Sequence, residues 1–188
     1  MRFKAISEEE MTPAQLAVYE EICAGPRGKR GPPGVRSTDI LTRCPELGLH
    51  AQRVGEYLRF RSTLPQRVME LAILTAARQW SAGFEWHAHY PIAVKAGLSQ
   101  SAIDDIGNGR EPRDLKEDEA AAYRFSVEIH RDRQVSDETF QAVWKHFGET
   151  GVVDLMGAAG YYTLISLVLK VNQTPVPEDS PYKLPELG

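Results

Sequence analysis

An acid and a histidine four residues apart, Glu85 and His89, are the side chains best suited to chemistry in this 188-residue chain. They follow Gly83, which ends an apolar segment that carries a second acid, Glu70. Residues i and i+4 of an α-helix lie on the same face, so Glu85 and His89 are expected to converge on one point. A carboxylate beside an imidazole is an acid–base pair that works near neutral pH. The spacing therefore predicts a site for proton transfer.

Both residues also have a purely structural interpretation. Glu85 lies where a helix is expected to begin, and the helix dipole favours a carboxylate in the first turn. His89 has Trp86 and Tyr90 nearby in the sequence, and a core histidine there would simply hydrogen-bond to Glu85. The residues alone leave the structural and the functional interpretation open.

A longer pattern favours the functional interpretation. Glu70, then Glu85-Trp86 with His89 after two further residues, then Ala96-Gly97-Leu98-Ser99 resembles the core of the carboxymuconolactone decarboxylase and alkylhydroperoxidase-D-like family. In the peroxidase branch of that family, a Cys-x-x-Cys pair stands where this chain has Ala82 and Glu85. The resemblance implies that Glu70 and His89 are a proton relay without its redox centre, and that Glu85 restores an ionisable group at the vacated place.

The resemblance implies a cofactor-independent enzyme, similar to 4-carboxymuconolactone decarboxylase, that acts on a small carboxylated lactone or cyclic acid. An unsaturated lactone carbonyl can accept the electrons that carbon dioxide leaves behind, so no cofactor is expected. His89 is the expected proton donor, oriented by Glu85, with Glu70 as a further proton partner. Arg78, two turns after Glu70, is a candidate for holding a substrate carboxylate if it faces inward. Trp86 is a candidate pocket wall, with core packing as its commoner role.

Two alternatives remain beside this prediction. A peroxidase-like antioxidant activity would need a thiolate, whereas Cys23 and Cys44 lie outside the motif. An oligomeric protein that binds a small acid without turning it over would keep the pocket. A metal site is not predicted, because zinc usually needs three protein ligands and His87 does not share the helix face of Glu85 and His89. His87 is expected to be exposed or at an interface.

Composition limits the partners. The net charge of −4 argues against nucleic acid and anionic membranes, because both attract a basic surface. The longest apolar run, Gly157 to Val171, contains tyrosines and a serine and is short for a membrane span. The N-terminus becomes acidic where a signal peptide needs an apolar core. We therefore expect a cytoplasmic protein with a small-molecule substrate.

The chain reads as a single all-α domain, a bundle of about seven or eight helices, because no stretch alternates apolar and polar residues as a strand does. The expected helices start at Pro13, run over about 45–60, about 65–80, 84–96, a short stretch after Ser99 and about 116–133, start again at Ser136 and run from Val152 to about Val171. A Gly/Pro-rich loop is expected at 25–37, where Arg27, Lys29 and Arg30 could meet an anionic group. From residue 172 we expect an extended arm on the surface or on another subunit.

The last helix is apolar nearly all round, which is typical of a helix buried on every side. It is therefore expected to be either the central core helix or part of a subunit interface. The family resemblance implies a homo-oligomer, a trimer or a hexamer.

Overall fold

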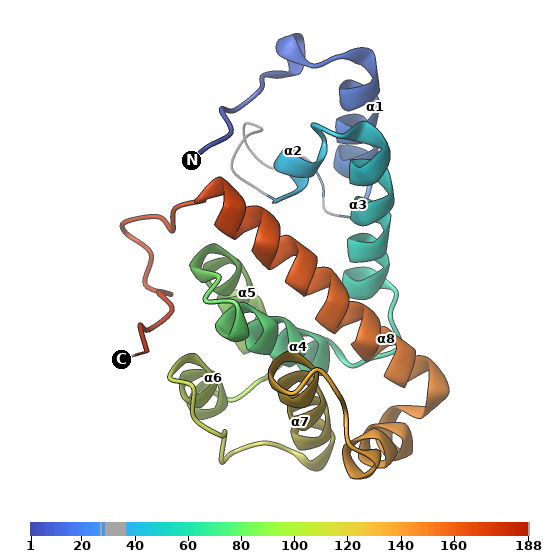
Figure 1. Cartoon of the computed structure of the whole chain (residues 1–188), viewed down its shortest axis with the longest axis vertical. Coiled ribbons are helices and arrows are strands. Elements are labelled where there is room, and N and C mark those ends of the chain that lie inside the picture. Colours follow the sequence, from blue (N-terminus) through green and yellow to red (C-terminus); the bar gives the residue numbers. More distant parts are fainter. Residues whose placement is uncertain (27, 29–36, 188) are drawn as a thin grey trace.

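The computed structural model describes residues 1–26, 28 and 37–187 of the chain (Figure 1). This part contains eight α-helices, one short 3-10 helix, η1, and no β-strand, so the all-α prediction is confirmed. The elements are η1 (Glu8–Glu10), α1 (Pro13–Ala24), α2 (Ser37–Leu41), α3 (Pro45–Phe60), α4 (Gln66–Gln79), α5 (Gly83–Ala96), α6 (Gln100–Gly107), α7 (Glu117–Arg131) and α8 (Asp137–Asn172). Arg27, Lys29 and Arg30, for which an anionic contact was predicted, lie outside the described residues.

Helix α4 is the centre of the bundle. Every residue from Val68 to Arg78 is buried, and α5, α6, α7 and α8 all pack against it. Helix α8 crosses the molecule with α2 and α3 on one side and α4, α5 and α7 on the other (Figure 1). Two of the candidate site residues, Glu70 and Arg78, therefore lie on the most enclosed helix of the fold.

Local signals explain where several helices begin and end. The Thr12 side chain accepts a hydrogen bond from the Gln15 backbone N–H, and the Gln15 side chain accepts one from Thr12 N–H, which forms a capping box at the predicted helix start. The Ser99 and Ser136 side chains cap α6 and α8 by accepting a hydrogen bond from a backbone N–H three residues later. Gly97 ends α5 with a φ of 92°, a left-handed conformation that a residue with a Cβ rarely adopts. Gly97 and Ser99 together fix the short connection between α5 and α6.

Helix α8 differs from its predicted form in two ways. The two helices predicted from Ser136 and Val152 join into one of 36 residues, with a kink at Gly148, where φ is 64°. The helix is also not buried on all sides within the chain, because Val153, Met156 and Val171 are more than half exposed. One apolar face of α8 is therefore uncovered in the single chain.

Among the described residues, α8 alone is long and apolar enough to cross a membrane by length and composition, with a mean hydropathy of 1.6 over 18 residues. The interpretation of Gly157 to Val171 as too short is corrected here, because the helix continues upstream of Gly157. More than half of that window, 56%, is buried inside the fold. A core helix satisfies the same criteria, so the observation is weak evidence for a membrane.

A buried carboxylate, Asp154, joins α8 to the start of the bundle. Its Oδ1 accepts a hydrogen bond from the Tyr57 hydroxyl at 2.8 Å, and its Oδ2 accepts from the Thr63 backbone N–H at 2.7 Å and from the Thr63 hydroxyl at 2.8 Å. Only 3% of Asp154 is exposed, so these hydrogen bonds replace most of its hydration. The side chain therefore holds α3, the α3–α4 connection and α8 in register.

Replacing Asp154 by alanine is expected to lower the free energy of unfolding by about 2–4 kcal/mol, because three donors lose a charged acceptor at once. Urea unfolding followed by circular dichroism measures the change. Tyr57→Phe removes only one of the three hydrogen bonds and should cost about 1 kcal/mol. Equal and small losses for both variants would contradict the assigned role of Asp154.

The segment after α8 folds back on its own chain. The Tyr182 ring stacks on the Tyr90 ring of α5, with ring centroids 4.6 Å apart. The Ser180 hydroxyl lies 2.6 Å from His87 Nδ1. A Cβ at Gly83 would lie 3.1 Å from the Val176 side chain, so the glycine permits this close approach. The predicted extended arm is present in the described residues and covers α5 of the same chain.

Candidate functional site

His89 lies between two carboxylates, one from each of two helices. Its Nδ1 is 2.7 Å from Oε2 of Glu70 on α4, and its Nε2 is 3.1 Å from Oε1 of Glu85 on α5. Both distances are those of hydrogen bonds. The i, i+4 spacing brings Glu85 and His89 together as predicted, and the packing of α4 against α5 adds Glu70.

These contacts determine the protonation of His89. Burial alone lowers the pKa of His89, but the charges of Glu70 and Glu85 and their hydrogen bonds outweigh burial and raise this pKa to about 9. An ionised carboxylate only accepts hydrogen bonds, so both ring nitrogens donate and the ring carries a positive charge at neutral pH. One cation between two anions leaves the cluster with a net charge of −1.

The cluster is open to a cavity on one side. Glu85 and His89 line a cavity of about 110 Å³ at the junction of α1, α2, α3, α5 and α8, whereas Glu70 lies behind His89 and is not part of the wall. The other lining residues are Ile22, Ser37, Thr38, Arg59, Phe84, Ala88, Tyr161, Tyr162 and Ile165. A cavity of about 150 Å³ holds benzene, so this smaller one holds only part of a carboxylated ring, and the rest of such a ligand would extend beyond it.

Two residues that line the cavity, Arg59 and Tyr162, were not predicted from the sequence. Arg59 of α3 brings a positive charge to the cavity wall. Among the described residues, no carboxylate forms an ion pair with it. Tyr162 is 2% exposed and meets the His89 ring edge-on, with ring centroids 5.4 Å apart. The sequence signal for Tyr162 was a pair of polar-tipped aromatic residues inside an apolar helix. For Arg59, the sequence offered no such signal.

Trp86 does not line this cavity. It is 1% exposed and lies against α6, where a Cβ at Gly107 would come within 3.0 Å of its ring. Its ring also meets Tyr90 edge-on, with centroids 6.0 Å apart. Positions 86 and 89 differ by three residues, yet the cavity opens beside Glu85 and His89 on the α8 side of α5. The structure therefore assigns Trp86 to packing, and the expectation of a pocket wall is corrected.

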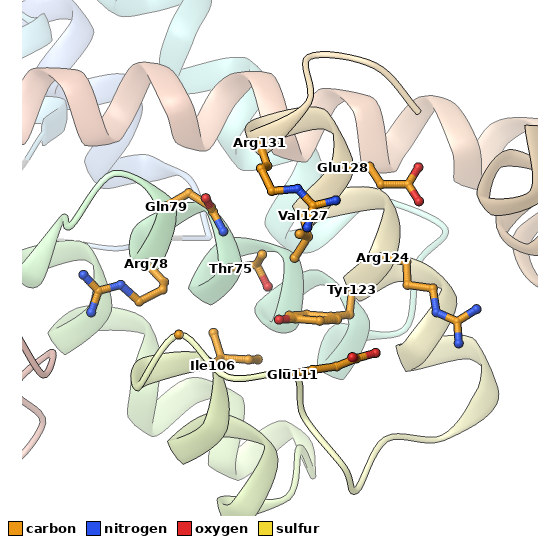
Figure 2. Close-up of a pocket in the computed structure, with 11 residues that line it drawn as sticks. Thr75, Arg78, Gln79, Ile106, Glu111, Tyr123, Arg124, Val127, Glu128 and Arg131 are labelled. Carbon is orange, nitrogen blue, oxygen red and sulfur yellow. The ribbon is translucent and has the colours of Figure 1, made fainter. Parts of the chain in front are cut away.

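Arg78 is buried, but its guanidinium lies between α6 and the C-terminal arm and not in the cavity beside His89. Its Nη1 donates to the carbonyl oxygens of Gly107 at 3.0 Å and Pro185 at 2.6 Å, and its Nη2 donates to the Ser81 hydroxyl at 2.9 Å. Its stem lines a second cavity, of about 360 Å³, and Figure 2 shows the guanidinium pointing away from the α7 side chains there. The expectation that Arg78 holds a substrate carboxylate beside His89 is corrected, because the guanidinium fastens the C-terminal arm to α6 instead.

The remaining candidates lie outside the cavity. His87, predicted to be exposed or at an interface, is half-buried under the arm, with the Ser180 hydroxyl 2.6 Å from its Nδ1. Cys23 is partly exposed and Cys44 is exposed, both are free thiols, and neither is among the cavity residues. In the described part of the chain, no three His, Cys, Asp or Glu side chains are arranged to hold a metal ion.

Comparison with known proteins shows what the helical bundle and the segment that carries the cluster resemble. Residues 45–128, which include Glu70, Glu85 and His89, match the carboxymuconolactone decarboxylase family. This match covers less than half of the chain and agrees with the resemblance seen in the sequence. No curated protein sequence matches the chain.

Solved structures extend the likeness to the whole fold. The alkylhydroperoxidase AhpD core of an uncharacterised peroxidase-related protein from Ralstonia eutropha JMP134 superposes with a TM-score of 0.74 at 12% identity, over 95% of this chain and 93% of that one. A protein of unknown function from Agrobacterium tumefaciens, described as a putative antioxidant defence protein AhpD, gives 0.64 at 20% identity, over 72% and 93%. A cysteine-to-alanine variant of the debrominase Bmp8 with 2,3,4-tribromopyrrole gives 0.68 at 9%, over 93% and 91%. The fold is therefore that of the AhpD core.

Proposed function

We propose that this protein is a cofactor-independent, decarboxylase-like enzyme that acts on a small carboxylated lactone or cyclic acid of the 4-carboxymuconolactone type. The observation that carries the proposal is the hydrogen-bonded series Glu70–His89–Glu85, whose last two members line a cavity that also contains Arg59. A buried ion cluster is costly to desolvate, and one serving packing alone has no need of a cavity beside it. The match of residues 45–128 to the carboxymuconolactone decarboxylase family supports the same chemistry.

The cluster suits the proton-transfer step of such a reaction. When the bond to the leaving carboxyl group breaks, its electron pair moves into the conjugated lactone carbonyl, carbon dioxide leaves and a dienolate remains. The dienolate must then take up one proton on carbon. His89 holds a proton on Nε2 that points at Glu85, so the proton passes through Glu85 to the ligand, and Glu70 keeps the imidazole in place from behind. A proton from solvent then restores the cluster.

Arg59 is the residue we assign to binding an anionic group of the substrate. Among the described residues of the cavity wall, it is the positive side chain apart from His89, whose charge is already balanced by two carboxylates. A guanidinium pairs with a carboxylate through two parallel hydrogen bonds. This pairing also offsets the negative charge of the cluster, which would otherwise repel an acid.

Arg59→Met is expected to raise KM by about 10- to 100-fold with a smaller change in kcat, because a charged hydrogen-bond pair contributes about 1.5–3 kcal/mol to binding. Steady-state kinetics measure both constants. Arg53→Met is the matched control, since Arg53 lies on the same helix but pairs with Glu21 outside the cavity. An equal change in KM for Arg59→Met and Arg53→Met would show that Arg59 does not bind the substrate.

The proposal as a whole is tested by ultraviolet-monitored turnover of 4-carboxymuconolactone by the purified protein. Turnover by the wild-type chain supports it. Binding of the lactone without turnover would leave a non-catalytic small-acid-binding protein. Peroxide consumption with a dithiol reductant would favour the antioxidant alternative, although neither Cys23 nor Cys44 is among the cavity residues.

We further propose that the chain assembles into a homo-oligomer, a trimer or a hexamer. The uncovered face of α8 supports this, because Val153, Met156, Leu167 and Val171 expose large apolar side chains along one helix. Next to that face lies an apolar hollow of about 720 Å³ between α7 and α8, lined in part by Met156 and Phe140. Sedimentation equilibrium of the purified protein tests the assembly, and a monomer at micromolar concentration would contradict it.

A further inference from the structure

A hollow of about 470 Å³ lies between the start of α5, the end of α8 and the C-terminal arm, and we call it the arm hollow. Its described lining residues are Arg78, Ser81, Gly83, Lys170 and 184–187. It shares none of them with the cavity of Glu85 and His89. The arm hollow has room for a small molecule, since about 150 Å³ suffices for benzene.

The guanidinium of Arg78 lies in the wall of the arm hollow. Its Nη1 donates to the Pro185 carbonyl and its Nη2 to the Ser81 hydroxyl, and both partners line the hollow. Figure 2 shows the guanidinium pointing away from the cavity between α4, α6 and α7 that the Arg78 stem also lines. One N–H of Nη2 is left for a ligand, because each Nη nitrogen carries two hydrogens.

Arg78 is a buried cation that lacks a counter-ion among the described residues. Only 7% of it is exposed, and no carboxylate in the described part of the chain forms an ion pair with it. Buried charges in proteins are normally paired, because the loss of hydration is costly. The three oxygens that accept its hydrogen bonds are neutral, so its charge stays unbalanced. An anion in the arm hollow would supply the missing partner.

Lys170 adds a second positive charge to the arm hollow. Its Nζ lies 3.5 Å from the Ser81 carbonyl oxygen, which is long for a hydrogen bond, so its three donors remain available. Glu186 is the carboxylate among the described lining residues, and no described ion pair joins it to Arg78 or Lys170. Two cations and one carboxylate give this wall a net charge of +1, in a chain whose net charge is −4.

The start of α5 adds neutral donors to these charges. Gly83 begins α5 in the wall of the arm hollow, and the N-cap residue Ala82 has no side-chain acceptor for the free N–H groups of the first turn. The positive end of the helix dipole also favours an anion there. The Ser81 hydroxyl accepts from Arg78 and can still donate its own hydrogen. Cations together with such donors form the set that oxyanions bind most strongly.

We infer that the arm hollow binds a small oxyanion, a phosphate or a carboxylate group, between Arg78 and Lys170. Both groups present ionised oxygens that accept hydrogen bonds from N–H donors. The inference goes beyond the proposed function, because the arm hollow shares no described residue with the cavity of Glu85 and His89. The bound anion joins the ends of α4 and α8 to the arm, so it also holds the arm against the bundle.

The first test is titration calorimetry of the full chain with inorganic phosphate and, separately, with acetate, in a buffer free of other oxyanions. We expect at least one of the two to bind with a Kd of about 1 mM or tighter. Lys170 and Glu186 are exposed, so both can be replaced without disturbing the core. Lys170→Gln should weaken the binding about tenfold, because a charged donor is lost. Glu186→Gln should strengthen it about two- to fivefold, because a negative charge leaves the wall.

Matched controls separate the arm hollow from the general charge of the chain. Lys95, like Lys170, is an exposed lysine in the last turn of a helix, and Glu178 is an exposed acid of the arm. Neither lines the hollow, so Lys95→Gln and Glu178→Gln should leave the affinity unchanged. Binding of phosphate alone assigns the site to a phosphate group, and binding of acetate alone assigns it to a carboxylate. Binding of neither, or equal affinity in wild type and Lys170→Gln, overturns the inference.

Limited proteolysis tests where the anion lies. Lys183 is an exposed trypsin site directly before the arm residues that line the hollow. At ten times its Kd, the bound probe should slow cleavage after Lys183 about tenfold, as for a ligand that binds only the state with the arm in place. In Lys170→Gln, the same concentration should slow cleavage only about twofold. Cleavage of the wild-type chain at an unchanged rate would place the anion away from the arm and overturn the inference.

Discussion

Replacing Glu85 by glutamine is expected to reduce kcat by about 10²–10⁴-fold, the range for loss of a positioned proton-transfer group. The amide keeps the size of the side chain and can still accept a hydrogen bond from His89 Nε2, which lies 3.1 Å from Glu85 Oε1. It cannot take up and release the proton that the imidazole passes on. The loss should therefore appear in kcat, while the fold and KM change little.

The structural interpretation of Glu85 is that it is a favourable charge in the first turn of α5, and a matched variant distinguishes that role. Glu46 is also an acid in the first turn of a helix, α3, and its side chain is exposed. Glu46→Gln removes the same interaction with a helix dipole and should leave kcat unaltered. Comparable losses for Glu46→Gln and Glu85→Gln would show that Glu85 acts through helix stability rather than proton transfer.

Stability is expected to fall by roughly 3 kcal/mol between pH 6.5 and 9.5 through the titration of His89. The pKa of His89 is raised from 6.5 to about 9 in the folded chain by its two carboxylate partners, against the opposing effect of burial. Below pH 6.5 the imidazole is protonated in both the folded and the unfolded state, so its contribution is fully present. Above 6.5 only the folded state holds the proton, and the contribution is lost as the pH rises through 9.

Thermal or urea unfolding over this pH range measures the effect, and a His89→Gln variant isolates it. Cysteine, lysine and tyrosine side chains also begin to titrate near pH 9. Their contributions are common to wild type and variant, so the difference between the two proteins belongs to His89. A stability difference that does not change between pH 6.5 and 9.5 would rule out an imidazolium between Glu70 and Glu85.

The helices were predictable because their signals are local. Pro45–Phe60 is found with the predicted bounds, and Gln66–Gln79 and Gly83–Ala96 begin or end within one or two residues of prediction. Apolar periodicity and capping residues specify such segments from sequence alone. The two elements that were missed, Glu8–Glu10 and Ser37–Leu41, span three and five residues, too few to show a period.

The site was predictable only in part, for the same reason. Glu85 and His89 share a helix face, so four residues of sequence suffice to bring them together. Arg59 and Tyr162 reach the cavity from α3 and α8. The local sequence of either helix does not show that it will pack beside Glu85 and His89. Arg78 shows the converse. Its burial in the apolar helix α4 was compatible with a site, but the carbonyl groups that satisfy it come from α6 and from the C-terminal arm.

The net charge of −1 on the cluster has a consequence for ligand affinity. An anion that enters the cavity beside Glu85 places a second negative charge next to the cluster of Glu70, His89 and Glu85. Its binding therefore favours uptake of one more proton by the cluster. Binding and protonation are then reciprocal, because a ligand that raises proton affinity is itself bound more tightly at low pH. Titration calorimetry would register this exchange as a binding enthalpy that varies with the ionisation enthalpy of the buffer. A neutral ring of the same size would bind without drawing protons from the buffer.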